Sequence, residues 1–407
     1  MKKFITLLLV LTGMVSTASA YSVAVKGTFD SWTGTSLDVI DGDEWVIKLP
    51  GSKLQSNDIE FKLWIDDTYW RGPSSAFTFT TPNGSSDYYT NEEGGGNFKL
   101  EKNTSATSIY IYVKFIDNNG GKTKFRVVPL VVTSYTDYPI KFSSTWGSVN
   151  AYSYYNDIPL QGIWPGESLS STSGSCSATL HALPGSKVIF TNGLGGDDNK
   201  TVELDIVRNG VYSKANGLSH ITVAISDAGY ATFSSEKSLN FNDQGVNAYV
   251  ASISLENKVV LSKHNKVPYN NGVLLKGDEG TYDIPITDSP DDISTNKLMA
   301  SVTETAVAAS TAGTYHYVLA NSSGIGFYNV ATATTSGAGK AYLETDVELA
   351  SEASARVAWV FDDESTGIEN VKQNVKANNE YFNIAGQRVA QPTKGLYIVN
   401  GKKVIIK

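Results

Sequence analysis

The sequence is poor in cysteine, in charge and in long apolar runs. It has one cysteine, Cys176, in 407 residues, which excludes a disulfide framework. Charged residues make up only 18% of the chain and the formal net charge is −8, with no basic run of the kind that nucleic-acid binding requires. Beyond residue 20, no segment approaches the ~20 apolar residues of a membrane-spanning helix. We therefore expect no nucleic-acid partner and no membrane span.

Sequence signals for catalysis are also missing. The four histidines are isolated, without the His-x-x-x-His spacing of zinc enzymes, and no Gly-x-Ser-x-Gly elbow for a nucleophilic serine is present. The 41 acidic residues would always allow a glycosidase-like carboxylate pair to be nominated, but the strand–helix alternation of a (β/α)₈ barrel is absent. The sequence predicts a protein that is not an enzyme, with no catalytic residue, no metal site and no cofactor.

The first 20 residues have the pattern of a secretory signal peptide. Lys2 and Lys3 precede an apolar run from Phe4 to Val10, and Ala18-Ser19-Ala20 forms a small-residue cleavage site. We expect a secreted protein, either extracellular or at the outer-membrane surface.

The remaining chain favours strands and turns. Runs of four to eight β-branched and aromatic residues alternate with Gly, Asn, Asp and Ser clusters, as in Ile59 to Ile65, Ile109 to Phe115 and Ala248 to Ser252. The fold class is predicted to be all-β, with tandem β-sandwich modules of immunoglobulin-like or jelly-roll type plus a small C-terminal β domain. The predicted domains are a signal peptide (1–20), an N-terminal sandwich (21–130), a second sandwich (131–217), a spacer module (218–364) and a C-terminal segment (365–407).

Tryptophan is concentrated in the first two modules. Six of the seven tryptophans precede residue 165, and only Trp359 lies beyond. A large aromatic side chain is costly to expose unless it packs in a core or stacks on a ligand, so the binding surface is expected in the N-terminal half. Within that half, Trp32 and Trp45 are predicted to be core residues.

The second module has the residue types that recognise sugars. Flat aromatic faces stack on the apolar face of a pyranose, and amide or charged groups bind its hydroxyls. In a strand from Val149 to Tyr155, alternation places Asn150, Tyr152 and Tyr154 on one face and the Val149 and Ala151 side on the core face. The two tyrosines are then either ligand-binding residues or ordinary half-buried strand tyrosines.

Two further motifs in this block resemble a known family. Trp164-Pro165-Gly166 and Val188 to Gly193 (VIFTNG), together with Val149 to Tyr155, resemble the family 26 carbohydrate-binding modules, which are starch-binding β-sandwiches. The resemblance covers residues 137–213. It implies that Tyr152, Tyr154 and Trp164 form an aromatic cradle for α-1,4-linked glucose, with Asn192 or a polar residue of 197–199 binding hydroxyls. Where the family often has Trp, this chain has Tyr154.

The N-terminal module resembles starch-binding sandwiches less closely. Gly27 to Trp32, Glu44 to Pro50 and Ile59 to Trp64 carry this resemblance. Alternation along the last of these segments places Lys62 and Trp64 on the face opposite the core. Trp64, Lys62 and Trp70 are therefore candidate residues of a second glucan site.

The last two segments are predicted to position the two N-terminal binding modules rather than to bind the ligand themselves. Residues 219–363 resemble a β-rich module of secreted Bacteroidetes proteins and are expected to act as a spacer. The segments Tyr381 to Val389 and Lys394 to Lys407 resemble the C-terminal sorting domain of type IX secretion, with Asn400-Gly401 as a hairpin turn. This resemblance implies export by the type IX secretion machinery; alternatively, the tail only completes the preceding sandwich.

Taken together, these patterns predict non-catalytic binding of starch or malto-oligosaccharide by aromatic stacking. Two alternatives stay open. One is a structural or adhesive surface protein that binds another protein, and the other is an accessory part of an α-glucan-degrading system with weak hydrolase activity.

Overall fold

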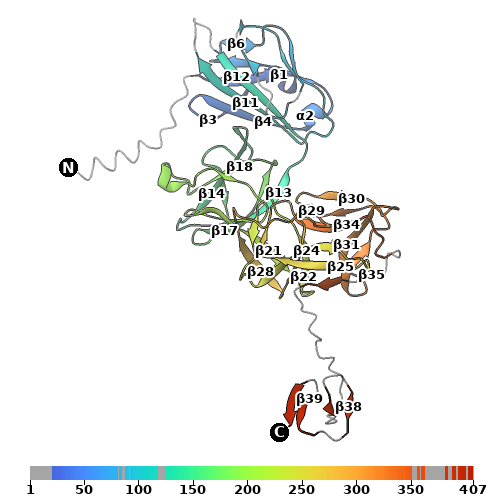
Figure 1. Ribbon diagram of the computed structural model, residues 1–407. Coiled ribbons are helices and arrows are strands. Elements are labelled where there is room, and N and C mark those ends of the chain that lie inside the picture. The colour runs from blue at the N-terminus through green and yellow to red at the C-terminus, as the bar shows by residue number, and fades with distance from the viewer. Residues whose placement is uncertain are drawn as a thin grey trace, which may run out of the picture. The chain divides into compact units, whose positions relative to one another are not determined.

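A computed structural model describes most of the chain after the predicted signal peptide. The described residues are 21–80, 82–84, 88–90, 92–117, 124–350, 355–357, 359–362, 381–383, 387–390, 393–399 and 402–406. The predicted signal peptide and the Asn400-Gly401 turn lie outside them. The chain forms two compact units, Met1–Val360 and Phe361–Lys407, which are drawn in Figure 1 and described separately below.

The regular structure is almost entirely β-strand, which confirms the predicted all-β sandwich-type fold. The helical elements of the described residues are short: η1 (Thr28–Asp30), α2 (Ser52–Gln55) and η3 (Asp197–Asn199). Within the described residues, no helix is long and apolar enough to cross a membrane.

The first sandwich consists of two sheets. One, called here the β1 sheet, has the order β2-β1-β5-β10-β7, with β6 paired to β5 and β9 paired to β6. Its strands are β1 (Val23–Gly27), β2 (Thr35–Ser36), β5 (Ile59–Ile65), β6 (Tyr69–Gly72), β7 (Phe77–Phe79), β9 (Glu92–Glu93) and β10 (Phe98–Leu100). The other, the β4 sheet, contains in spatial order β3 (Asp38–Asp41), β4 (Glu44–Pro50), β11 (Ser108–Asp117), β12 (Lys124–Val132) and β8 (Tyr88–Tyr89).

Strict alternation along β5 explains how this sandwich forms. Ile59, Phe61, Leu63 and Ile65 are buried, while the residues between them are only partly buried. The buried set packs against β4, β11 and β12 in one core that includes Trp45, which is 1% exposed as predicted. The intervening residues of β5 therefore form the outer face of the β1 sheet.

The second sandwich also has two sheets. The β13 sheet contains in spatial order β17 (Ser175–Ala182), β13 (Thr136–Ser143), β20 (Gly210–Ser213), β21 (Gly217–Ile225) and β28 (Gly280–Pro285). The β14 sheet contains β15 (Ile158–Pro159), β14 (Val149–Tyr155), β18 (Lys187–Thr191) and β19 (Leu204–Asp205), with β16 (Glu167–Leu169) also paired to β14. Because β21 and β28 extend the β13 sheet, hydrogen bonding continues across residue 217.

The first two sandwiches share an apolar interface. The outer face of the β4 sheet contributes Tyr110 and Tyr112 to the same buried cluster as Ile158 and Leu160 of the second sandwich. The Tyr110 hydroxyl lies 3.0 Å from the Leu160 carbonyl oxygen, to which it donates. The second sandwich is thus packed directly against the first.

The third module is built on two larger sheets and two small ones. The β24 sheet contains in spatial order β22 (Tyr230–Phe233), β27 (Val273–Gly277), β24 (Val246–Ile253), β25 (Val259–His264) and β36 (Trp359–Phe361). The β31 sheet contains β29 (Leu298–Ser301), β34 (Lys340–Thr345), β31 (Tyr315–Asn321), β32 (Ile325–Asn329) and β35 (Arg356–Val357). The two-stranded sheets are β23 (Leu239–Asn240) with β26 (Lys266–Val267), and β30 (Thr305–Val307) with β33 (Thr334–Ser336).

The described strands of the terminal unit form a four-stranded sheet. Its spatial order is β38 (Arg388–Val389), β37 (Tyr381–Phe382), β39 (Gly395–Val399) and β40 (Lys402–Ile406). All its pairings are antiparallel. The domain boundaries and the sorting role proposed from the sequence remain predictions.

Candidate functional site

Strand β14 positions the two predicted tyrosines on the outer face of the β14 sheet. Val149, Ala151 and Ser153 are 0%, 2% and 0% exposed, so they form the core face of the strand. Tyr152 and Tyr154 point the other way, and their ring centroids lie 5.5 Å apart with an interplanar angle of 33°.

Trp164 completes the aromatic cluster that the sequence predicted. Its ring lies 5.5 Å from that of Tyr152 and nearly perpendicular to it, at 73°. Tyr152 is only 9% exposed, less than expected for a residue of an open face, because it is flanked by both other rings. We call Tyr152, Tyr154 and Trp164 the cradle.

The Trp164-Pro165-Gly166 motif holds its loop directly against β14. Gly166 has φ +92°, and a Cβ atom there would lie 2.3 Å from the Ala151 carbonyl oxygen, so no larger residue fits without displacement. The Asn150 side-chain amide donates to the Gly166 carbonyl at 3.2 Å, and the Thr191 hydroxyl donates to the Pro165 carbonyl at 3.1 Å. The peptide bond between Trp164 and Pro165 is cis. These contacts fix Trp164 beside Tyr152.

The Asn192 side chain forms hydrogen bonds within its own loop. Its side-chain amide donates to Asn199 Oδ1 at 2.7 Å, and its Oδ1 accepts from the Leu194 backbone amide at 2.9 Å. The residue shapes the loop between β18 and η3, and any sugar contact has to use its remaining hydrogen-bonding capacity.

Two charged residues that the sequence analysis did not single out lie at the cradle. The Tyr154 hydroxyl donates to the Glu203 carboxylate, and Lys200 Nζ lies 5.8 Å from the Trp164 ring centroid. Burial, followed by the neighbouring Glu203, raises the pKa of Tyr154, so the hydroxyl stays protonated. No local sequence pattern marks either charged residue, because their positions depend on how the loop after β18 folds back.

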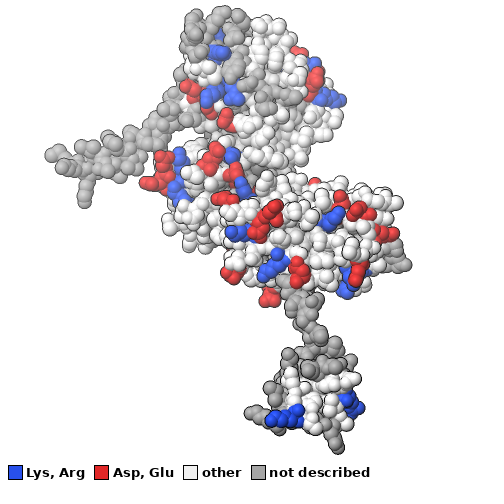
Figure 2. Space-filling view, in the orientation of Figure 1, with Lys and Arg blue, Asp and Glu red and all other residues white. Residues whose placement is uncertain are grey.

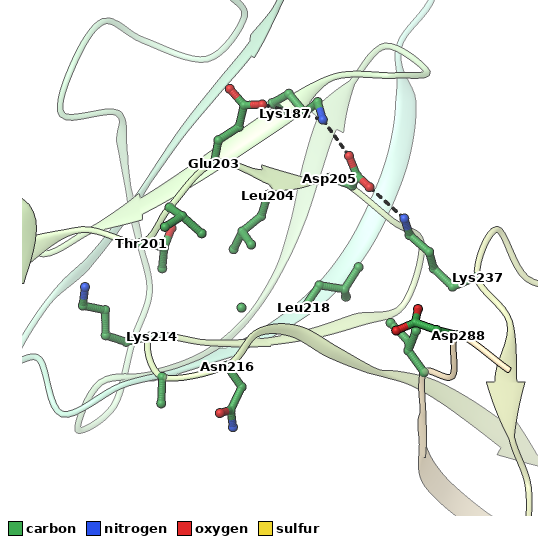
Figure 3. Close-up of a pocket in the computed structure, with 14 residues that line it drawn as sticks. Lys187, Thr201, Glu203, Leu204, Asp205, Lys214, Asn216, Leu218, Lys237 and Asp288 are labelled. Atoms are coloured by element: carbon green, nitrogen blue, oxygen red, sulfur yellow. Dashed lines mark hydrogen bonds and ion pairs between the residues drawn. The ribbon is translucent and has the colours of Figure 1, made fainter.

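Glu203 also lies at the edge of an open groove of about 620 Å³. Lys187 Nζ is 3.7 Å from Glu203 and 2.8 Å from Asp205, which pairs with Lys237 at 2.7 Å. Figure 3 shows this chain of charges along one side, Lys214 and Asn216 on the other, and Leu204 and Leu218 between them. The groove therefore combines an apolar centre with a polar rim.

The N-terminal candidates form a second aromatic cluster. Trp64 and Trp70 are cross-strand partners of β5 and β6, with ring centroids 4.8 Å apart. Lys62 Nζ lies 5.9 Å from the Trp70 ring. The structure thus brings Trp64, Lys62 and Trp70 together on the outer face of the β1 sheet.

Trp32 and Lys26 belong to the same cluster and were missed from the sequence. The prediction that Trp32 is a core residue is wrong: it is 36% exposed, and its ring lies 6.2 Å from that of Trp70. Lys26 Nζ lies 4.1 Å from the Trp64 ring centroid. Alternation along β1, in which Val23 and Val25 are buried, could have placed Lys26 on this face.

Charges of both signs are mixed on the face of the molecule drawn in Figure 2. On the face drawn in Figure 2, acidic and basic side chains lie side by side over the second and third modules. Among the residues that the structure describes, no group of three or more His, Cys, Asp or Glu side chains is placed to hold a metal ion.

Comparison of the chain with family models, with curated proteins and with solved structures gives no match. The residues of the two aromatic clusters therefore provide the structural evidence for function.

Proposed function

We propose that this chain is a secreted, non-catalytic binder of starch-like α-glucan, and that the cradle is its binding site. The observation that carries the proposal is the placement of Tyr152 between Tyr154 and Trp164 on the outer face of β14, each ring 5.5 Å from that of Tyr152. Three adjacent aromatic rings, two on β14 and one on the loop that packs against it, form a surface suited to the apolar faces of consecutive sugar rings.

The polar groups around the rings complement the hydroxyls of a neutral sugar. Tyr154 presents a protonated hydroxyl beside the Glu203 carboxylate, and Lys200 supplies an ammonium group beside Trp164. Together these groups offer donors and acceptors at the edges of the rings, as in other sites where a few polar groups orient a mainly apolar contact. The resemblance of residues 137–213 to family 26 carbohydrate-binding modules supports α-1,4-linked glucose as the ligand.

The proposal includes location at the cell surface or outside it. It is supported by the signal-peptide pattern of 1–20 and by the resemblance of the C-terminal segment to a type IX sorting domain. Deletion of 365–407 is expected to stop export in a host with this secretion machinery, measured by immunoblotting of cell and medium fractions. Unchanged export of the shortened chain would contradict the sorting role.

Affinity electrophoresis in gels containing soluble starch tests the binding function. The wild-type chain should be retarded, and a Tyr152→Ala plus Trp164→Ala variant should migrate as in a starch-free gel. Tyr269→Ala is the matched control, because Tyr269 is 61% exposed and lies outside the second sandwich. An unretarded wild-type chain would refute the proposal, and release of reducing sugar from starch would show that the chain is an enzyme.

A further inference from the structure

The outer face of the β1 sheet carries two lysines at directly opposed positions. In the antiparallel pairing of β1 with β5, Lys26 lies directly opposite Lys62, and Ala24 lies directly opposite Trp64. Like charges directly opposite one another in a sheet repel and destabilise the pairing. The arrangement therefore calls for a compensating interaction.

Within the described residues, neither lysine is paired with a carboxylate. Lys26 Nζ is held over Trp64 at 4.1 Å and lies 5.4 Å from Trp70, and Lys62 Nζ donates to the Gly95 carbonyl at 2.7 Å. The acidic neighbour on this face, Glu60, accepts a hydrogen bond from the Asn97 amide at 2.8 Å. The amide hydrogen bond leaves the Glu60 carboxylate charged, so these three side chains (two ammonium groups and one carboxylate) carry one net positive charge on an aromatic surface, in a chain of net charge −8.

Trp32 is held at the edge of this surface by a constrained loop. The Asp30 carboxylate accepts hydrogen bonds at 3.0 Å from each of the Gly27, Trp32 and Gly34 backbone amides. Trp32 itself has φ +63°, a conformation that is costly for a bulky side chain and persists only where the surroundings impose it. The loop maintains an unfavourable backbone conformation that leaves Trp32 exposed beside Trp70.

The cradle and the cluster of Trp32, Trp64 and Trp70 differ in the charge of their neighbouring side chains, and this difference favours different ligands. The Lys26 ammonium group lies over the Trp64 ring, so a neutral sugar that stacks there has to compete with this cation–π contact. A sugar with an anionic substituent would instead pair with that group, and charge-assisted hydrogen bonds are about twice as strong as neutral ones. The cradle differs, because Glu203 disfavours an anion there and its Lys200 ammonium group is already paired with Asp197 at 3.1 Å.

We propose that Trp32, Trp64 and Trp70, with Lys26 and Lys62, form a second binding site that takes an acidic saccharide. Its aromatic surface contacts the pyranose ring, and the two ammonium groups bind a carboxylate or sulfate substituent between them. The site is independent of the cradle and does not depend on starch binding.

Isothermal titration calorimetry of the full chain tests this site with three probes: a galacturonic acid oligomer, sulfated dextran and maltoheptaose. The test variants are Trp32→Ala and the pair Lys26→Gln plus Lys62→Gln. The control pair, Lys258→Gln plus Lys297→Gln, changes the net charge equally in the third module. Thermal unfolding of each variant checks folding; if Trp32→Ala is unfolded, the lysine pair decides the test.

The wild-type chain should bind at least one anionic probe, more weakly at 300 mM than at 50 mM NaCl. Trp32→Ala and the lysine pair should each weaken this binding at least tenfold, whereas the control pair and the maltoheptaose titration should be unchanged. Binding of the galacturonic acid oligomer alone assigns a carboxylate ligand, and binding of sulfated dextran alone assigns a sulfate ester. Absence of binding to both anionic probes, equal weakening by the control pair, or loss of maltoheptaose binding in Trp32→Ala would each overturn the proposal.

Discussion

Asp205 links the second sandwich to the third module and gives a pH-dependent prediction. Its carboxylate lies 2.8 Å from Lys187 Nζ and 2.7 Å from Lys237 Nζ. Hydrogen bonds from Lys187 and Lys237 lower its pKa to about 2 from 3.8. A shift of that size corresponds to roughly 2.4 kcal/mol at 1.36 kcal/mol per pKa unit. Because the side chain is 46% exposed, solvent screening reduces the expected contribution to about 1 kcal/mol.

The direction of the pH dependence follows from the lowered pKa. The folded chain binds the Asp205 proton less tightly than the unfolded chain, so the stabilisation is fully present above about pH 4 and is lost as the pH falls toward 2. Urea unfolding of wild type and Asp205→Asn, followed by fluorescence from pH 7 to pH 2.5, should show a difference of about 1 kcal/mol that shrinks below pH 4.

Asp197→Asn is the matched control, because Asp197 is 96% exposed in its 3.1 Å pair with Lys200. We expect no measurable change in its unfolding. Wild-type unfolding of Asp205→Asn at pH 7, or a difference between Asp205→Asn and wild type that is undiminished at pH 2.5, would contradict this stabilisation by Asp205.

Three further predictions follow from the packing. Phe98→Ala should destabilise the first sandwich by about 3–5 kcal/mol in urea unfolding, since Phe98 is fully buried; an effect below 1 kcal/mol would contradict its place in the core. Tyr110→Phe leaves the Leu160 carbonyl without its donor and should cost about 1–3 kcal/mol; unchanged unfolding would argue against this interface contact. Gly166→Ala should weaken starch retardation while the first sandwich unfolds normally, because the loop bearing Trp164 has to move away from β14; wild-type retardation would refute this role for the glycine.

The sequence is sufficient to predict strands that have either strict alternation or a short run of β-branched and aromatic residues. The predicted runs Ile59 to Ile65, Ile109 to Phe115 and Ala248 to Ser252 all lie within strands. Only the first of them alternates between buried and partly buried residues; the other two are buried on both faces and are marked by β-branched and aromatic residues between turn signals. The core position of Trp45 and the outward direction of Tyr154 follow from alternation.

Residues whose positions depend on loops were not predictable in this way. The sequence predicts Trp32 in the core because it does not show that the Asp30 carboxylate fixes a turn with positive φ after η1. Glu203 and Lys200 reach the cradle only through the path of the loop after β18. Pairing between distant segments, such as β21 with β28, likewise has no local sequence signal.

Calorimetric titration of the full chain with maltoheptaose is the most direct test of the central claim, that the cradle binds α-glucan. We predict saturable binding by wild type, at least tenfold weaker binding by Trp164→Ala, as expected when a large aromatic contact of the cradle is lost, and wild-type affinity for Tyr269→Ala. Absence of binding by the wild-type chain, or equal affinity of wild type and Trp164→Ala, would contradict it.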